Sequence, residues 1–340
     1  MIILSKRIKV IQYGLGAMGT EMAKIILKKK DLELVGAIVN RPEKNGKDIG
    51  ELIGIRKKVG IKAYNDIKKV YNECDADVML HASVSYVPKV WEQIQPAVSK
   101  GINVITIAEE MGYPFVKYKT LSKKIDSAAK KHDVSILGSG INPGFAMDLM
   151  PVILTGICNE VELIKVTRLI DFSPFGPSIQ KNIGIGMDVK EFNNKIKSKQ
   201  LPLHIGLPES MQMLAAALKW KLSKIYETRD SVVAEKNINV PGYMKVNAGK
   251  VAGFDHRCFG QVKNKTKIIL EELGRIDPKL DYRNTIEIRG SPNLIETVNV
   301  PPGQITTTNH AVNLIPKVLN AKPGLLCMMD ILPTPVLPKK

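Results

Sequence analysis

Glycines near the start of the chain have the spacing of a phosphate-binding turn. The run follows an apolar segment and opens an amphipathic one: Gly14-Leu15-Gly16-Ala17-Met18-Gly19. In a strand–turn–helix unit, the first glycine makes the tight turn, the second lets the backbone approach a pyrophosphate, and the third lets helix and strand pack closely. The unpaired N–H groups of the helix N-terminus would hold the phosphates. The run therefore predicts a dinucleotide site.

The residue that selects the dinucleotide is expected about 20 positions after this run, where NAD-selective folds usually have Asp or Glu for the ribose 2′-OH. This chain has Asn40 and Arg41 there. An amide beside a guanidinium tolerates or attracts a 2′-phosphate. We therefore predict NADP as the cofactor, with NAD as an alternative. The alternative is that Arg41 is simply exposed and does not bind the cofactor.

Two adjacent glutamates, Glu109 and Glu110, follow the fifth predicted strand. Ligands of doubly wound sheets bind beyond the carboxyl ends of the strands, so one of the two side chains should face that crevice. No Ser/His/Asp order, CxxC pair or metal-ligand spacing accompanies them. The chemistry must then come from the cofactor with acid–base help, and we expect no metal. A solvated acid at a helix start is the alternative for either residue.

Small residues at other strand ends would allow the cofactor to pass closely. Ala82 and Ser83 follow the fourth predicted strand, and Ala108 follows the fifth. Asn142, after the sixth, could hydrogen-bond the nicotinamide carboxamide or the substrate, although Asn before Pro in a turn is as easily structural. These four residues complete the predicted cofactor site.

The elements that must position these residues alternate between short Val- and Ile-rich runs and segments of helical period. This pattern is typical of a parallel sheet covered on both faces, so we predict an α/β Rossmann-type doubly wound domain. The predicted strands are Ile8–Tyr13, Leu32–Val39, Ile61–Ala63 (weaker), Val78–His81, Asn103–Ile107 and Val134–Leu137.

Beyond Pro143 the pattern changes to long polar–apolar alternation, as in Val161–Asp171 and Thr285–Ile288. It predicts a second α+β domain on an open mixed sheet. Thr307–Leu319 has helical period. The predicted division is a dinucleotide-binding domain over 1–141, a substrate and dimerisation domain over 142–305, and a C-terminal helix and tail over 306–340 that returns to the first domain.

Composition restricts the class of protein. The 340 residues exceed what one core usually serves, and no apolar run is long enough to span a membrane. The net charge of +17 raises nucleic acid as a partner, but the basic pairs are scattered, so we expect none. The four cysteines have no disulfide or zinc spacing, which favours a reducing, cytoplasmic location.

Five runs carry a family resemblance. GLGAMG, VGAIVNRPEKNGKDIGELIG, ITIAEEMGYP, GSGINPGF and HAVNLIPKVLNAKPGLLCMMDILPTP resemble 2,4-diaminopentanoate dehydrogenase and the related native amine dehydrogenases. The segment 46–52 also resembles dihydrodipicolinate reductase, a distant relative. That enzyme's paired histidines followed by a lysine are missing, so ring reduction is the less favoured alternative. A non-catalytic dinucleotide sensor is another, but it would need no carboxylate in the crevice.

The resemblance implies oxidative deamination of an amine, such as 2,4-diaminopentanoate, to ketone and ammonia, and the reverse reductive amination. An alkyl ammonium has a pKa near ~10 and must lose a proton before its carbon can give up hydride. A crevice carboxylate is a suitable base. We carry this role onto Glu109, with Glu110 as the fallback. A homodimer is the expected assembly.

An amino-acid substrate would need its carboxylate bound, and arginine suits bidentate contact. The candidates are Arg168, His204 and the pair His256-Arg257. A structural imidazole is the alternative for each histidine. Three further residues are assigned to the substrate pocket: Phe145, Thr307 and Asn309. For Thr307 and Asn309, which open the last predicted helix, capping of that helix is the alternative.

Overall fold

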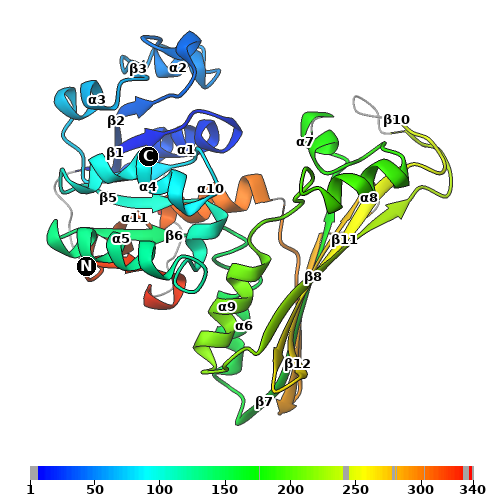
Figure 1. The fold of residues 1–340 in the computed structure, drawn as a ribbon. Coiled ribbons are helices and arrows are strands. Elements are labelled where there is room, and N and C mark those ends of the chain that lie inside the picture. Colours follow the sequence, from blue (N-terminus) through cyan, green and yellow to red (C-terminus); the bar gives the residue numbers. More distant parts are fainter. Residues whose placement is uncertain are drawn as a thin grey trace. The chain divides into compact units, whose positions relative to one another are not determined.

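The chain folds into two units, described by a computed structural model (Figure 1). The first unit contains residues 1–145 and 303–340, and the second contains residues 146–302. The sequence placed these divisions at 141/142 and 305/306, a few residues away. The structure describes residues 7–175, 177–239, 245–277, 280, 282–301, 303–331 and 337–338.

Unit 1 is built on a seven-stranded parallel sheet in the order β15-β6-β5-β4-β1-β2-β3. The chain runs from β1 to β2 and β3, then crosses back to β4 on the other side of β1, so the order reverses between β1 and β4. This confirms the predicted doubly wound fold. The bounds are β1 (Ile8–Tyr13), β2 (Leu32–Ile38), β3 (Ala63–Tyr64), β4 (Val78–His81), β5 (Asn103–Thr106), β6 (Ser135–Gly138) and β15 (Gly324–Leu326).

Helices cover both faces of this sheet. The apolar stripe of α4, which includes Trp91, is buried in one cluster with residues of α3 and α5. Helix α1 packs against α10, which the chain reaches only after unit 2. The bounds are α1 (Ala17–Lys28), α2 (Ile49–Leu52), α3 (Ile67–Glu73), α4 (Val87–Val98), α5 (Lys119–Lys131), α10 (Gly303–Asn313) and α11 (Ile315–Leu319), with short 3₁₀ turns η1 (Pro42–Lys44), η2 (Glu109–Gly112) and η3 (Met328–Asp330).

The C-terminal segment differs from the sequence expectation in two ways. The single helix expected over Thr307–Leu319 is two helices, because Pro316 lacks the N–H that would continue α10 and instead lies in the first turn of α11. The segment then adds strand β15 in parallel to β6. Three residues are too few to show strand periodicity, so the sequence did not indicate β15.

Unit 2 is built on a six-stranded mixed sheet in the order β14-β13-β7-β12-β11-β8, in which only the β7–β12 pair is parallel. Helices α6 and α9 contact it, and an apolar cluster lies under α7 and α8. The bounds are β7 (Glu160–Asp171), β8 (Lys224–Val233), β9 (Ile238–Asn239), β10 (Lys245–Val246), β11 (Val251–Val262), β12 (Lys265–Arg275), β13 (Arg283–Ser291), β14 (Leu294–Val298), α6 (Leu149–Thr155), α7 (Pro177–Asn182), α8 (Val189–Lys197) and α9 (Leu207–Ala217).

Alternation along these strands separates two faces of the sheet. From Ile164 to Ile170 in β7 and from Ile268 to Arg275 in β12, buried residues alternate with partly buried ones. We call these the covered face, which includes Val166 and Leu270, and the open face, which includes Thr167 and Glu271. The alternating run predicted at Val161–Asp171 is β7, and Thr285–Ile288 lies within β13.

All four cysteines are free thiols. Over the ranges that the structure describes, no helix combines the length and the apolar character needed to cross a bilayer.

Candidate functional site

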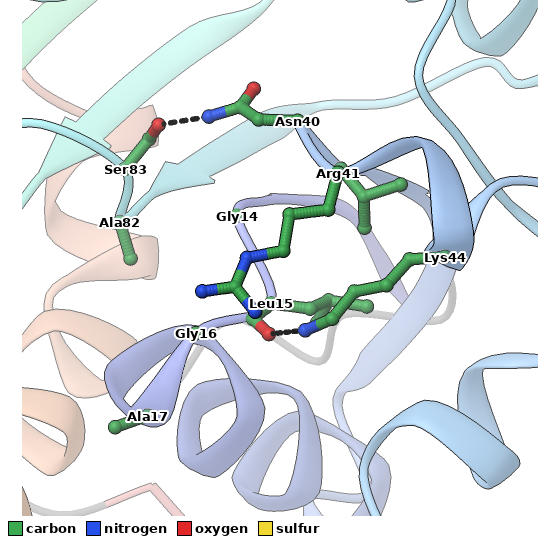
Figure 2. A pocket seen from close by; sticks show the side chains of 10 residues that line it. Gly14, Leu15, Gly16, Ala17, Asn40, Arg41, Lys44, Ala82 and Ser83 are labelled. Atoms are coloured by element: carbon green, nitrogen blue, oxygen red, sulfur yellow. Dashed lines mark hydrogen bonds between the residues drawn. The ribbon is translucent and has the colours of Figure 1, made fainter.

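A pocket lies at the carboxyl ends of β1, β2 and β4, where the strand order reverses (Figure 2). It brings together most of the residues predicted to bind the cofactor. Met18, Gly19, Ala108 and Asn142 were also predicted but do not line it. The lining residues are Gly14, Leu15, Gly16, Ala17, Val39, Asn40, Arg41, Lys44, Ala82 and Ser83.

The three glycines meet different demands. Gly14 has φ +89°, and a Cβ there would lie 2.3 Å from the Ala82 carbonyl oxygen. A Cβ on Gly19 would lie 1.8 Å from the carbonyl oxygen of Gly14, so only glycine lets α1 pack on this turn. A Cβ on Gly16 would meet no atom within 4 Å. Gly16 is the N-cap residue of α1. It has no side chain, so no side-chain hydrogen bond caps this end of the helix. The turn therefore offers open space and free N–H groups, which fits a dinucleotide pyrophosphate.

Polar side chains lie around this turn. The Asn40 amide donates to Ser83 Oγ at 2.7 Å, which joins β2 to β4 across the glycine turn. Lys44 Nζ donates to the Leu15 carbonyl at 2.5 Å. Figure 2 shows the Arg41 guanidinium extending over the same turn. Its ion pair with Glu43 is exposed and 4.0 Å long, so this pair constrains Arg41 little.

Lys44 was missed by sequence reasoning. It lies three residues after Arg41, and η1 turns the chain between them. The sequence showed a basic residue three positions after Arg41, but we did not predict the 3₁₀ turn η1 that brings it to the pocket.

The two glutamates after β5 have different surroundings. Glu110 is fully buried; its carboxylate accepts a hydrogen bond from the Val87 N–H at 3.0 Å and pairs with Lys117. It therefore satisfies the N-terminus of α4, and the fallback assignment of Glu110 as base is not supported by its contacts. Glu109 is half-buried, and its carboxylate has no hydrogen bond or ion pair with any described residue.

A buried histidine positions the turn that carries Glu109. His81 Nδ1 lies 2.9 Å from Thr106 Oγ1, and His81 Nε2 lies 2.8 Å from Gln93 Oε1. Burial lowers the pKa of His81 to about 4, so the ring is neutral near pH 7. It then donates from Nε2 to Gln93 and accepts the Thr106 hydroxyl, which in turn accepts the Ala108 N–H at 3.1 Å. This network was not visible in the sequence, because its members are separated along the chain.

Close contacts join the Glu109 turn to the loop after β6. A Cβ on Gly138 would lie 1.9 Å from the Met111 carbonyl oxygen, and one on Gly112 would lie 2.6 Å from the Pro143 ring. Neither position can hold a larger residue, so η2 lies directly on β6 and its loop. Asn142, in this loop, is 8% exposed.

Helix α10 contacts the same loop. The Thr307 hydroxyl accepts the Ile141 N–H at 3.1 Å, and the Phe145 and His310 rings are 5.1 Å apart. The structure thus brings Phe145 and Thr307 to the region that follows β5 and β6. Asn309 lies elsewhere: it is exposed and its amide bonds the Ile305 carbonyl of its own helix. Asn309 is two residues after Thr307 in α10, and side chains two residues apart in a helix point to different sides.

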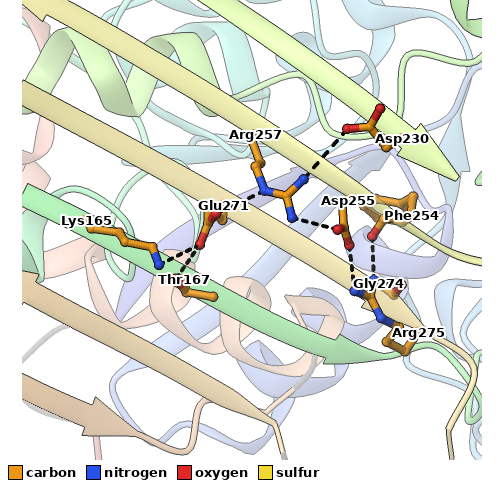
Figure 3. Close-up of polar contacts among 9 residues, drawn as sticks. All are labelled: Lys165, Thr167, Asp230, Phe254, Asp255, Arg257, Glu271, Gly274 and Arg275. Carbon is orange, nitrogen blue, oxygen red and sulfur yellow. Dashed lines mark hydrogen bonds and ion pairs between the residues drawn. The ribbon is translucent and has the colours of Figure 1, made fainter. Parts of the chain in front are cut away.

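The substrate candidates of unit 2 are distributed over two faces and a loop. Arg168 and His256 lie on the covered face, 3% and 0% exposed. Arg257 lies on the open face and is bound there by Glu271 and Asp255 at 3.0 and 2.7 Å (Figure 3). His204 lies in the loop between α8 and α9. Arg257 is therefore a structural residue, whereas Arg168 remains a candidate.

Comparison with known proteins gives consistent results. Residues 145–338 match the family described as 2,4-diaminopentanoate dehydrogenase C-terminal domain, and residues 8–107 match dihydrodipicolinate reductase, N-terminus. The chain is 41% identical to the 2,4-diaminopentanoate dehydrogenase of Acetoanaerobium sticklandii, over 97% of this chain and 94% of that protein. It is 23% identical to an amine dehydrogenase of Streptomyces virginiae, over 95% and 96%.

Among solved structures, the amine dehydrogenase from Mycobacterium smegmatis superposes with a TM-score of 0.85 at 26% identity, over 97% of this chain and 98% of that one. The likeness to dihydrodipicolinate reductase is more distant: one such relative, from Methanocaldococcus jannaschii, is 34% identical over only 29% of this chain. The expected resemblance to 2,4-diaminopentanoate dehydrogenase is confirmed. The protein is an oxidoreductase with a nicotinamide dinucleotide site. The chain belongs to the 2,4-diaminopentanoate dehydrogenase family.

Proposed function

We propose that this protein catalyses the NAD(P)-dependent oxidative deamination of 2,4-diaminopentanoate, or of a related amine, to a ketone and ammonia, together with the reverse reductive amination. The observation that carries the proposal is the unpaired, half-buried carboxylate of Glu109 at the carboxyl end of β5. Since β5 is two strands from β1 and strands are about 4.8 Å apart, this end of the sheet lies about 10 Å from the dinucleotide turn.

Glu109 acts as the base in this reaction. A substrate amine enters protonated, because its pKa is near ~10, and the Glu109 carboxylate accepts that proton. A bound nicotinamide supplies the acceptor for the hydride that leaves the amine carbon. Once Glu109 has released this proton to solvent, its carboxylate stabilises the cationic C=N group and accepts a proton from the water that adds before ammonia leaves.

Other residues of unit 1 position the reactants. Glu110 fixes the backbone next to Glu109 through Val87, and the His81–Thr106 pair fixes it from the other side. We assign Phe145 and Thr307 to the wall that contacts the substrate, and Asn142 to the nicotinamide carboxamide or the substrate. Phe145 packs on His310, whose pKa burial lowers to about 4, so this wall is neutral near pH 7.

NADP is the proposed cofactor. Arg41 and Lys44 lie side by side at the end of β2, and Asn40 stands where an acidic residue would reject a 2′-phosphate. Two cations on this rim, the exposed Arg41 and the half-buried Lys44, favour a dianionic phosphate over a hydroxyl. The Glu43 carboxylate reduces this preference without reversing it, because its pair with Arg41 is solvent-exposed.

Replacement of Glu109 by Gln tests the proposed function. The variant keeps the shape of the side chain but cannot accept the proton, so kcat for amine oxidation should fall about 10³-fold. The dissociation constant for NADPH, measured by fluorescence, should change little.

Glu110→Gln is the matched control. It should lower the melting temperature, because it weakens the contacts with Val87 and Lys117, and it should reduce kcat much less than Glu109→Gln does. Near-normal turnover of Glu109→Gln would contradict the proposal.

We also propose a homodimer that pairs through the open face of the unit 2 sheet. That face carries the stacked rings of Tyr226 and Phe259, 4.9 Å apart, beside a network of paired charges. Light scattering should give twice the 37.6 kDa chain mass.

A further inference from the structure

A buried glutamine in β1 is hydrogen-bonded to the glycine turn of unit 1. Gln12 is 0% exposed, and its Nε2 donates to two carbonyls of the chain that follows, Tyr13 at 3.2 Å and Gly14 at 3.1 Å. A Cβ on Gly19 would lie 2.9 Å from the same nitrogen, so Gln12 also lies against the first turns of α1. The side chain therefore contacts both parts of the strand–turn–helix unit that the dinucleotide requires.

The contacts of Gln12 fix the orientation of its amide. If its nitrogen and oxygen were exchanged, an amide oxygen would face two carbonyl oxygens, which is repulsive. Oε1 is therefore directed away from these carbonyls, and it is buried without a hydrogen-bond partner among the described residues. An apolar side chain in this place would leave the Gly14 carbonyl without a partner instead. Either residue leaves one buried acceptor unsatisfied, so stability alone does not explain a glutamine here.

The Gly14 carbonyl sets the direction of the next N–H group. The carbonyl and the N–H of one trans peptide unit point in opposite directions, so the hydrogen bond from Gln12 directs the Leu15 N–H away from the Gln12 amide. The N–H groups of Leu15 and Gly16 make no hydrogen bond with any residue that the structure describes. Both residues line the dinucleotide pocket (Figure 2).

Loss of the Gln12 amide would change what this turn offers to a ligand. The Gly14 carbonyl is buried, and no other described group donates to it. It would regain a partner if the Gly14–Leu15 peptide rotated toward the water of the pocket. That rotation turns an N–H donor out of the pocket and brings a partially negative oxygen into it. An anionic pyrophosphate would then meet an acceptor where it needs a donor.

We propose that Gln12 is a positioning residue for the dinucleotide pyrophosphate. It acts through the backbone, because its amide holds the Gly14–Leu15 peptide in the orientation that presents free N–H groups to the phosphates. The unpaired Oε1 is a consequence of this orientation. The inference concerns the dinucleotide turn itself, so it applies to NAD and NADP alike.

Gln12→Met tests this role, since it removes the amide at nearly constant side-chain length. Its dissociation constants for NADPH and NADH, measured by fluorescence titration, should both rise about 30-fold, as expected when one hydrogen bond to a charged group is lost. Its melting temperature should stay near that of the wild type. Gln93→Met is the matched control: Gln93 binds His81 and not the glycine turn, so both dissociation constants should remain unchanged.

Fragments of the cofactor locate the effect. 2′-Phospho-ADP-ribose and ADP-ribose contain the pyrophosphate, whereas 2′-AMP and adenosine do not. In displacement titrations, Gln12→Met should bind the first two about 30-fold more weakly than the wild type does, and the last two within about twofold. Equal weakening of all four ligands, or of none, would overturn the proposal. No amine is present in these titrations, so their outcome is independent of the proposed reaction.

Gln12→Glu gives a second test through its pH profile. The ionised carboxylate has no hydrogen to donate, but the protonated acid has one. Burial beside two carbonyl oxygens raises the pKa of such a group, so dinucleotide affinity relative to the wild type should recover as the pH is lowered from about 8 to about 6. At the lower pH this variant should bind more tightly than Gln12→Met, because relief of charge repulsion alone would only equal the apolar variant. A profile parallel to that of the wild type in folded Gln12→Glu would overturn the proposal.

Discussion

The two units place their polar groups in different parts of the secondary structure. In unit 1 they follow the carboxyl ends of parallel strands: the glycine turn after β1, Asn40 and Arg41 after β2, Ser83 after β4 and Glu109 after β5. In unit 2 they lie within strands, as Arg168 and His256 do. Unit 1 therefore depends on the geometry of its turns, and unit 2 on the register of its strands.

The two units also differ in how exposed their charged side chains are. The Arg41 side chain is 75% exposed, whereas Arg168 is 3% exposed. An exposed guanidinium attracts an anion weakly and is screened by salt, whereas a buried one interacts strongly but must be compensated. We expect correspondingly small effects from charges at the rim of unit 1 and large effects from its packed backbone.

The largest effect should come from adding one methyl group to the turn of unit 1. Gly19→Ala places a Cβ against the Gly14 carbonyl and should destabilise the protein by about 3 kcal/mol or more. Gly16→Ala has open space, so its melting temperature should stay near that of the wild type while NADPH binding weakens. Thermal scans and cofactor titrations distinguish the two. A Gly19→Ala variant as stable as Gly16→Ala would show that the turn adapts.

The second largest effect should be a loss of folding stability at acidic pH. His81 and His310 of unit 1 have folded pKa values of about 4, below the ordinary 6.5. The unfolded chain therefore binds more protons between pH 6.5 and 4, and stability should fall as the pH is lowered through this window. Each histidine accounts for up to about 3 kcal/mol. In unit 2 the pKa of His256 is also lowered by burial, but Glu227 opposes the shift.

Urea unfolding at several pH values measures this loss. His310→Leu removes one titrating group and should make the decline shallower. A wild-type profile that is flat between pH 6.5 and 4 would contradict the assignment of neutral, buried rings.

The smallest effect should come from the exposed rim. Arg41→Ala should reduce the ratio of kcat/KM with NADPH to that with NADH about tenfold, as expected for one lost charge-assisted contact. Lys44→Ala should act in the same direction. A wild-type enzyme that strictly prefers NADH would contradict the proposed choice of NADP, and so would an Arg41→Ala variant with an unchanged ratio.

Sequence reasoning predicted unit 1 well for a physical reason. A strand, a turn and a helix are neighbours along the chain, so the glycine run, Arg41 and Glu109 could each be assigned to the end of a strand. The pairing of Glu110 with α4 could not be predicted, because Val87 is far from it in the sequence. The same holds for His81 and Thr106.

In unit 2 the sequence indicated alternating strands and several candidates, among them Arg168. It could not show that Asn284, Glu272 and His256 share its face, because this depends on the pairing of four strands. Arg257 was proposed with His256, and one residue of displacement along β11 places it on the opposite face.

The last strand of unit 1 has a consequence for biosynthesis. β15 completes the edge of the sheet beside β6, and the Asp126 carboxylate on α5 accepts the Leu325 N–H at 3.1 Å. A ribosome has therefore translated all of unit 2 before this edge can close. Until then β6 presents unpaired backbone groups, to which a chaperone or another nascent chain can bind. A chain that terminated before Gly324 would lack β15 and leave that edge exposed permanently, although every residue of the dinucleotide turn had been made.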